Sequence, residues 1–226
     1  MDFSYLLEYN SFFFKGAAIT IFLSFFTVIF GALFGTGFAL MKLSKNKILK
    51  GISSVFIEIV RGTPLLVQLY ILFYGLPLMG INLPEINAFG TNFTDFIAGI
   101  LALTINSTAY VAEIIRGGIQ SIDKGQMEAA RSLGMGHKMA MSHIVIPQAV
   151  KNILPALGNE FITVIKESAI VSVIGIHEIM FNAQLVTGVT FKPISPYIFA
   201  ALIYFVLTFG LSKLIGKFER KMKISD

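Results

Sequence analysis

One uncharged stretch near the start of the chain limits what the rest can fold into. Lys15 and Lys42 bracket residues 16–41, which are mostly apolar and contain no charged side chain. The stretch is longer than the roughly 20 residues that an α-helix needs to cross the hydrocarbon core of a bilayer. Acidic residues precede it and no small-residue cleavage site closes it, so a spanning helix is expected rather than a secretory signal.

The composition of the chain also indicates a membrane protein. Of its 226 residues 55% are hydrophobic and 14% are charged, and its mean hydropathy is +0.76, which is outside the range of ordinary soluble domains. Four more apolar segments follow the first, separated by polar or Gly/Pro-containing loops. We therefore expect an all-α integral membrane protein, one domain over residues 1–226, with five transmembrane helices at about 16–41, 52–79, 96–118, 153–176 and 196–216.

Basic residues gather on one side of this expected topology. They lie in the connection after the first span, in the long connection at about 119–151, and in the C-terminal tail. The loop at 76–95 contains no Lys or Arg, and the loop at 177–195 contains only Lys192. Since basic loops stay in the cytoplasm, the pattern predicts the N-terminus outside and the C-terminus inside. The net charge of +5 therefore comes from basic residues that mark one side of the membrane, and no nucleic-acid partner is expected.

Ionisable side chains in the fourth expected span indicate a polar path, because each costs about 2.5–3.5 kcal/mol to insert. At helical spacing Glu160, Thr163 and Glu167 share one face, where carboxylates could hold an ammonium or guanidinium group. Lys166 points about 100° away from Glu167. The alternative is that Lys166 pairs with a carboxylate and only fixes helix packing. The candidate substrate-binding residues are Glu160, Thr163, Glu167, Ser168, Asn106 and Ser107.

A candidate gate or hinge lies in the second expected span. It consists of Arg61, Gly62, Thr63 and Pro64. Proline has no amide hydrogen and kinks or loosens a helix, which membrane helices tolerate where other groups satisfy the freed carbonyl. The sequence therefore predicts a flexible point within this span.

Two shorter patterns in the first and third spans predict helix contacts. Glu113 and Arg116 stand three residues apart, which predicts an ion pair that is either interfacial or functional. Gly31 and Gly35 form a GxxxG pattern, which predicts close packing of the first span on a neighbour.

Catalytic and metal-binding patterns are missing from the sequence. The three histidines lie on both expected sides and no HExxH spacing occurs, so no metal site is expected. No GxxxxGK followed by Ser or Thr is found, so the chain has no phosphate loop for ATP. The chain is not expected to be an enzyme, and any ATP-driven process would need a second subunit.

Several motifs carry a family resemblance. The connection KGQMEAARSLGMGHKMAMSHIVIPQAV resembles the EAA loop of permease subunits from bacterial ABC importers. The strings RGTPLLVQ at 61–68 and AYVAEIIRGGIQSI at 109–122 resemble the polar amino acid subgroup of that family. KESAIVSVIG resembles a stretch often written KDTSLVSVIG, with Ala169 in place of the usual Ser. The resemblance covers essentially the whole chain.

The resemblance implies the five-helix core of a type I importer permease in a bacterial cell membrane, surrounded by lipid. It implies a dimer with a second permease copy or homologue, a dimer of separate ATPase subunits that bind ATP and Mg²⁺, and an extracytoplasmic solute-binding protein. This chain itself would hold no cofactor. The EAA loop would form a coupling helix that docks on the ATPase. The residues to which this role is carried over are Glu128, Ala129, Ala130, Gly134 and Pro147.

The substrate implied by the resemblance is a polar amino acid. Two carboxylates on one helical stripe favour a basic one such as arginine, lysine or histidine, because opposite charges attract strongly at low dielectric. The alternative is an ion-coupled secondary transporter that uses Glu160 and Glu167 as proton or cation sites. Such transporters are commonly built from inverted repeats, and the sequence shows no internal repeat.

Overall fold

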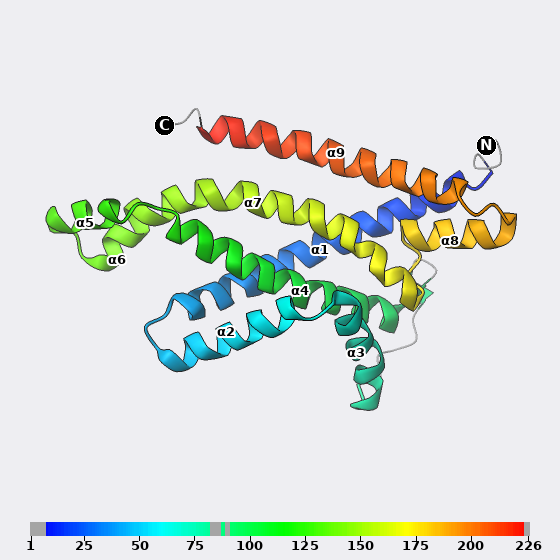
Figure 1. The fold of residues 1–226 in the computed structure, drawn as a ribbon, viewed down its shortest axis with the longest axis horizontal. Coiled ribbons are helices and arrows are strands. Elements are labelled where there is room, and N and C mark those ends of the chain that lie inside the picture. Colours follow the sequence, from blue (N-terminus) through cyan, green and yellow to red (C-terminus); the bar gives the residue numbers. More distant parts are fainter. Residues whose placement is uncertain (1–7, 82–86, 89–90, 224–226) are drawn as a thin grey trace.

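The computed structural model describes residues 8–81, 87–88 and 91–223 as an elongated bundle of helices (Figure 1). The ends of the expected domain, residues 1–7 and 224–226, lie outside the described residues. Three helices are individually long and apolar enough to cross a membrane: α1 (Asn10–Leu43), α4 (Phe93–Gln120) and α9 (Ser195–Lys223). They contain the expected spans at 16–41, 96–118 and 196–216 and confirm them as helices.

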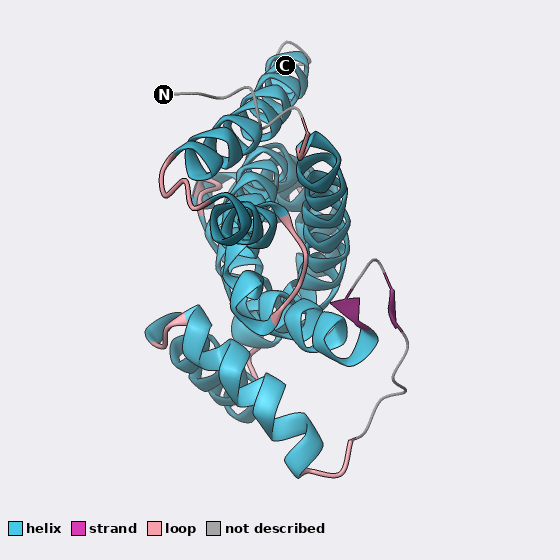
Figure 2. Cartoon of the chain, turned by 90° about the vertical axis from the view of Figure 1, so that its right-hand side faces the viewer, coloured by secondary structure: helices cyan, strands magenta, loops and turns pink. Residues whose placement is uncertain are grey.

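The second expected span is not one helix. α2 (Lys47–Gly62) and α3 (Leu65–Leu78) meet at an angle of 105°, and Figure 2 shows α3 projecting away from the rest of the bundle. The expected span over 52–79 thus consists of two helices, and the break between them lies at Pro64, where the sequence predicts a flexible point. Thr63 and Pro64 are both extended between the two helices, because a residue before proline avoids the helical region and proline cannot donate the next hydrogen bond.

The fourth expected span, at 153–176, lies within a longer helical segment. α7 (Ile146–Glu167) continues as a 3₁₀-helix (Ser168–Ile174), which ends at Gly175 with φ 85°. α8 (Ile179–Thr190) follows at a bend of 48°, in a stretch expected to be a loop. The described residues thus contain three single candidate spans, or up to five if each bent pair crosses the membrane as one.

The long connection between α4 and α7 is largely helical. It contains α5 (Lys124–Ser132), α6 (His137–Ala140) and a π-helical turn (Met141–Val145). Gly134 has φ 86° just beyond α5, a left-handed conformation that favours glycine and ends a helix. Gly134 therefore ends α5 and lets the chain change direction. A two-stranded antiparallel hairpin, β1 (Asn87–Ala88) and β2 (Thr91–Asn92), precedes α4.

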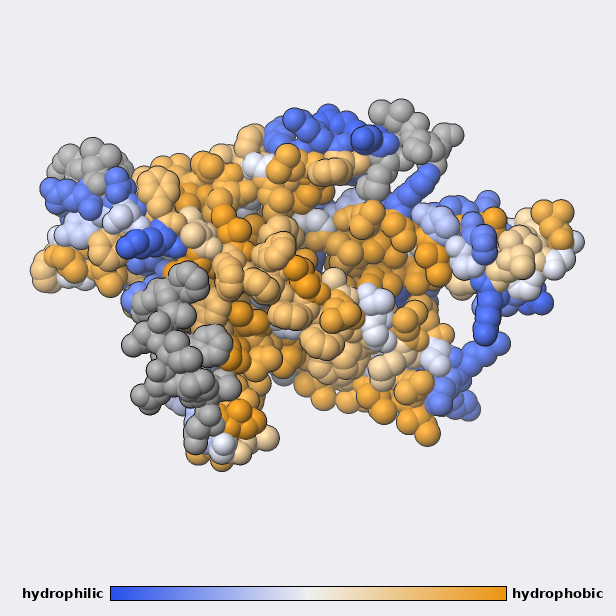
Figure 3. Space-filling model, turned by 180° about the vertical axis from the view of Figure 1, so that it is seen from behind, coloured by the Kyte–Doolittle hydropathy of each residue, from blue (hydrophilic) through white to orange (hydrophobic). Residues whose placement is uncertain are grey.

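Small residues allow α1 and α4 to pack closely. A Cβ atom added at Gly31 would lie 2.8 Å from the Ser107 hydroxyl, and one at Gly35 would lie 2.7 Å from Val111. The predicted role of the GxxxG pattern in close packing is confirmed. Many large apolar side chains remain exposed on the bundle, and Figure 3 shows them as a broad band between more polar ends, as expected for a surface that faces lipid and partner helices.

Candidate functional site

Glu160 is a buried carboxylate near the middle of α7. It is 8% exposed, and its Oε1 accepts a hydrogen bond of 3.0 Å from the Ser107 hydroxyl of α4. Ser107 is itself buried. Two of the predicted substrate-binding residues, far apart in the sequence, therefore meet between α4 and α7.

Asn106, the neighbour of Ser107, contacts a different helix. Its Nδ2 donates to Oε1 of Gln68 in the first turn of α3, over 3.4 Å. Adjacent residues on a helix point about 100° apart, so α4 turns one polar side chain toward α7 and the next toward α3.

The remaining predicted residues of α7 are engaged mainly with their own helix. The Thr163 hydroxyl donates to the Asn159 carbonyl, and the Ser168 hydroxyl donates to the Ile165 carbonyl. Glu167 is half-buried. Lys166 is exposed and, among the described residues, forms no ion pair within 4.0 Å with Glu160 or Glu167. No direct ion pair therefore joins Lys166 to either carboxylate among the described residues, and the alternative in which Lys166 neutralises one of them stays open.

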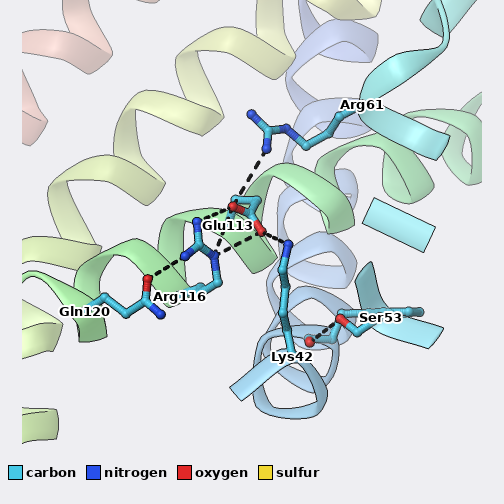
Figure 4. A network of polar contacts seen from close by, with 7 residues as sticks. Lys42, Ser53, Arg61, Glu113, Arg116 and Gln120 are labelled. Carbon is cyan, nitrogen blue, oxygen red and sulfur yellow. Dashed lines mark hydrogen bonds and ion pairs between the residues drawn. The ribbon is translucent and has the colours of Figure 1, made fainter. Parts of the chain in front are cut away.

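Three cations surround one carboxylate near the α2–α3 break (Figure 4). Glu113 accepts from Arg116 Nη2 at 2.7 Å and from Lys42 Nζ at 2.7 Å, and Arg61 Nη1 lies 3.8 Å away. The predicted Glu113–Arg116 pair is confirmed and extends to α1 and α2. Arg61 is 44% exposed and its guanidinium lies over the Tyr110 ring, 5.3 Å from the ring centroid. The cluster joins three helices and includes Arg61, the first of the predicted hinge residues.

The predicted hinge residues occupy the break itself. Gly62 ends α2, Thr63 and Pro64 are extended, and α3 begins at the next residue. The Thr63 hydroxyl donates to the Ile59 carbonyl over 2.8 Å. Because Pro64 has no amide hydrogen to donate back to α2, this is a point where the chain can change direction.

The predicted coupling residues lie on and around α5. Glu128 and Ala129 are exposed, whereas Ala130 is buried against the rest of the chain. Gly134 is exposed directly after the helix, and Pro147 is at the start of α7, where a missing amide hydrogen costs little. Of these motif residues on α5, one small residue and one carboxylate are therefore exposed on the helix.

Sequence reasoning missed two polar residues that connect helices. Gln68 bridges α3 and α4, and Glu178 caps α8 and contacts α9. Gln68 is four residues after Pro64, a spacing that could have suggested a side chain serving the break. Glu178 directly precedes an apolar helix, where a negative charge is favoured by the helix dipole.

Comparisons with known proteins give consistent matches over nearly the whole chain. Residues 28–224 match the model of the family described as binding-protein-dependent transport system inner membrane component. A putative glutamine transport system permease protein of Rickettsia bellii is 40% identical and aligns over 99% of this chain and 100% of its own. An arginine transport system permease protein of Bacillus subtilis is 40% identical over 100% of this chain and 99% of its own. A nopaline transport system permease protein of Agrobacterium fabrum is 36% identical over 95% of this chain and 89% of its own.

Solved structures share the fold. The crystal structure of an amino acid ABC transporter with histidines contains a chain with a TM-score of 0.90 and 52% identity, matched over 98% of this chain and 99% of that one. The MetNI methionine ABC transporter, in an inward facing conformation, matches with a TM-score of 0.74 at 17% identity, which supports the fold alone. With the family model matching most of the chain, this protein belongs to the binding-protein-dependent transport system inner membrane components, the multi-pass permeases of bacterial ABC transporters.

Proposed function

We propose that this chain forms the membrane path of an ATP-driven importer for polar amino acids, and that Glu160 favours basic ones. Relatives named for glutamine, arginine and nopaline transport, and a similar transporter structure containing histidines, support an amino acid substrate. Membership of a binding-protein-dependent family favours this function over the ion-coupled alternative.

The burial of Glu160 carries the proposal of a basic substrate. The carboxylate accepts from one hydroxyl and, among the described residues, forms no ion pair within 4.0 Å. A carboxylate has about four acceptor sites, so most of its capacity is unused by the chain. A substrate ammonium or guanidinium group could fill that capacity and offset the cost of burying the charge. Asn106, Ser107, Thr163, Glu167 and Ser168 would line the same path.

Replacement of Glu160 by Gln tests the selectivity. The permease, reconstituted in proteoliposomes with its ATPase and binding protein, is assayed for uptake of labelled arginine and labelled glutamine. Loss of one charge-assisted hydrogen bond, about 1.5–3 kcal/mol, should reduce arginine uptake about tenfold or more and glutamine uptake far less. Glu58→Gln, at an exposed carboxylate of α2, is the matched control. Equal loss for both amino acids would assign Glu160 a structural role.

The proposed assembly follows from the family. Two permeases, identical or homologous, pair in the membrane with the N-terminus outside and the C-terminus inside, and residues 1–226 act as one membrane domain. A dimer of ATPase subunits binds ATP and Mg²⁺ on the inner side, and an extracytoplasmic solute-binding protein delivers the amino acid. Arg61, Gly62, Thr63 and Pro64 form the flexible part of the gate. Their position at the α2–α3 break supports this role.

The proposed contact with the ATPase is α5. Glu128 and Ala129 are exposed on this short helix, and Gly134 turns the chain back directly after it. Glu128→Arg should reverse a charge at the contact, so that uptake falls strongly while the ATPase still hydrolyses ATP. Glu128→Gln removes the charge without reversing it and should have an intermediate effect. Full uptake by Glu128→Arg at normal expression would contradict the assignment.

A further inference from the structure

The break between α2 and α3 leaves the last backbone carbonyls of α2 without their usual partners, and the Val60 carbonyl is one of them. In a continuous α-helix the Val60 carbonyl would accept from the amide of residue 64. That residue is Pro64, which has no amide hydrogen. An unpaired carbonyl away from water is costly, so another donor is needed at this point.

Gln68 supplies that donor from the other side of the break. Its Nε2 lies 2.7 Å from the Val60 carbonyl and 3.1 Å from the Thr63 carbonyl, and also donates to Thr63 Oγ1 over 2.9 Å. Gln68 belongs to the first turn of α3, whereas Val60 belongs to the last turn of α2. A single side-chain amide therefore fixes how the two helices meet.

The other end of the same amide bonds to Asn106, one of the proposed substrate-binding residues. Gln68 Oε1 accepts from Asn106 Nδ2, and the neighbouring Ser107 donates to Glu160. The Asn106 contact is the longest of these bonds, at 3.4 Å, and so it is the easiest to exchange for a bond to a substrate. The hinge and the buried carboxylate are thus joined through two adjacent residues of α4.

We propose that Gln68 is a positioning residue that transmits substrate occupancy at the Glu160 site to the α2–α3 hinge. The proposal rests on the proposed function. When a substrate takes over the Asn106 amide, Gln68 Oε1 loses its donor and the side chain can rotate. Val60 and Thr63 then lose their shared partner, and the angle between α2 and α3 relaxes. With the site empty, the Asn106 contact holds the amide in place and the hinge stays at its angle.

A Gln68 side chain that only stabilised the α2–α3 break would behave differently. It would lower stability when removed, but the remaining hinge would still respond to substrate. Substitutions can also distinguish the contribution of the amide oxygen from that of the amide nitrogen. Gln68→Leu removes both ends, whereas Gln68→Glu keeps an acceptor for Asn106 and removes the donors to Val60 and Thr63.

The hinge angle can be measured directly because the chain contains no cysteine. Val55→Cys on α2 and Tyr74→Cys on α3 place two spin labels at exposed positions on either side of the break. Pulsed electron paramagnetic resonance then gives the distance distribution in the complete transporter in nanodiscs, with binding protein, with and without arginine or glutamine. The same samples give the ratio of amino acid-stimulated to basal ATPase activity.

We expect the labelled parent to shift its distance distribution when the amino acid is added. Gln68→Leu and Gln68→Glu should show the same distribution with and without it, and their ATPase stimulation ratio should fall toward one. Gln184→Leu, at an exposed glutamine of α8, should behave as the parent. If Gln68→Leu fails to assemble, Gln68→Glu still decides the question, since it preserves a polar side chain of the same size.

Two results would overturn the proposal in distinguishable ways. A Gln68 variant whose distance distribution still shifts with substrate would show that the glutamine only stabilises the break. Uptake by the parent in that case would leave the proposed function intact. A labelled parent that takes up neither amino acid, in a complex that hydrolyses ATP, would contradict the proposed function and the inference together.

Discussion

Glu178 shows how one buried side chain can hold several helices. It is fully buried, and its carboxylate accepts from the backbone amides of Met180 and Phe181 at the start of α8. The Tyr204 hydroxyl of α9 donates to the same carboxylate over 2.5 Å. Gly16 of α1 packs against the Glu178 backbone, because a Cβ atom there would lie 2.9 Å from its carbonyl carbon. The residue thus joins α1, α8 and α9.

Tyr204→Phe is expected to destabilise the protein by about 1–3 kcal/mol, because it leaves a buried carboxylate short of one donor while keeping the ring. The measurement is thermal unfolding of the purified permease in mild detergent. Tyr197→Phe, on the same helix, is the control, because the Tyr197 hydroxyl forms no hydrogen bond within the described part of the chain. An unchanged unfolding temperature in Tyr204→Phe would mean that water replaces the hydroxyl.

Single residues differ in how readily their roles can be predicted from the sequence. Glu160 could be predicted because a charge inside an apolar segment is costly and therefore conspicuous. Gln68 gives a weaker signal, because a neutral amide carries little penalty; its spacing from Pro64 points to the break, but not to its partner Asn106, which is 38 residues away. Glu178 was overlooked because the stretch around it was expected to be a loop.

At the scale of elements, the α1–α4 contact depends on the small size of Gly31 and Gly35. Gly31→Ala would place a Cβ atom 2.8 Å from the Ser107 hydroxyl, and overpacking of this kind typically costs about 1–3 kcal/mol. Since Ser107 also holds Glu160, uptake should fall along with thermal stability. Gly37→Ala is the control on the same helix, because nothing lies within 4 Å of its added Cβ atom. Equal behaviour of the two variants would contradict close packing at Gly31.

The elements that could be predicted are those fixed by their own composition. α1, α4 and α9 are long and apolar, so hydropathy alone finds them. Pro64 indicated a flexible point, but the angle of 105° depends on the packing of α3 and on the Gln68 amide, which no local pattern reveals. α8 has 12 residues, too few to cross a membrane alone, and its helical form depends on the Glu178 cap and on contacts with α1 and α9.

At the scale of the whole molecule, the basic connections gather at one end of the bundle. Figure 1 shows the α1–α2 turn, α5, α6 and the end of α9 together at one end, and the β-hairpin and α8 at the other. The Glu113 cluster, with three cations around one carboxylate, includes Lys42 from the end of α1. The fold therefore brings together basic residues that are widely separated in the sequence, which is the arrangement that the positive-inside rule requires.

The side of the membrane that this basic end occupies can be tested with single cysteines, because the chain has none of its own. Lys45→Cys lies in the α1–α2 turn at the basic end, and Val189→Cys lies on α8 at the other end; both positions are exposed. In spheroplasts, a membrane-impermeant maleimide should label Val189→Cys at once and Lys45→Cys only after the membrane is permeabilised. The cysteine-free parent should remain unlabelled in both conditions. The reverse labelling would place α5 outside the cell, away from ATP, and would contradict both the orientation and the proposed coupling through Glu128.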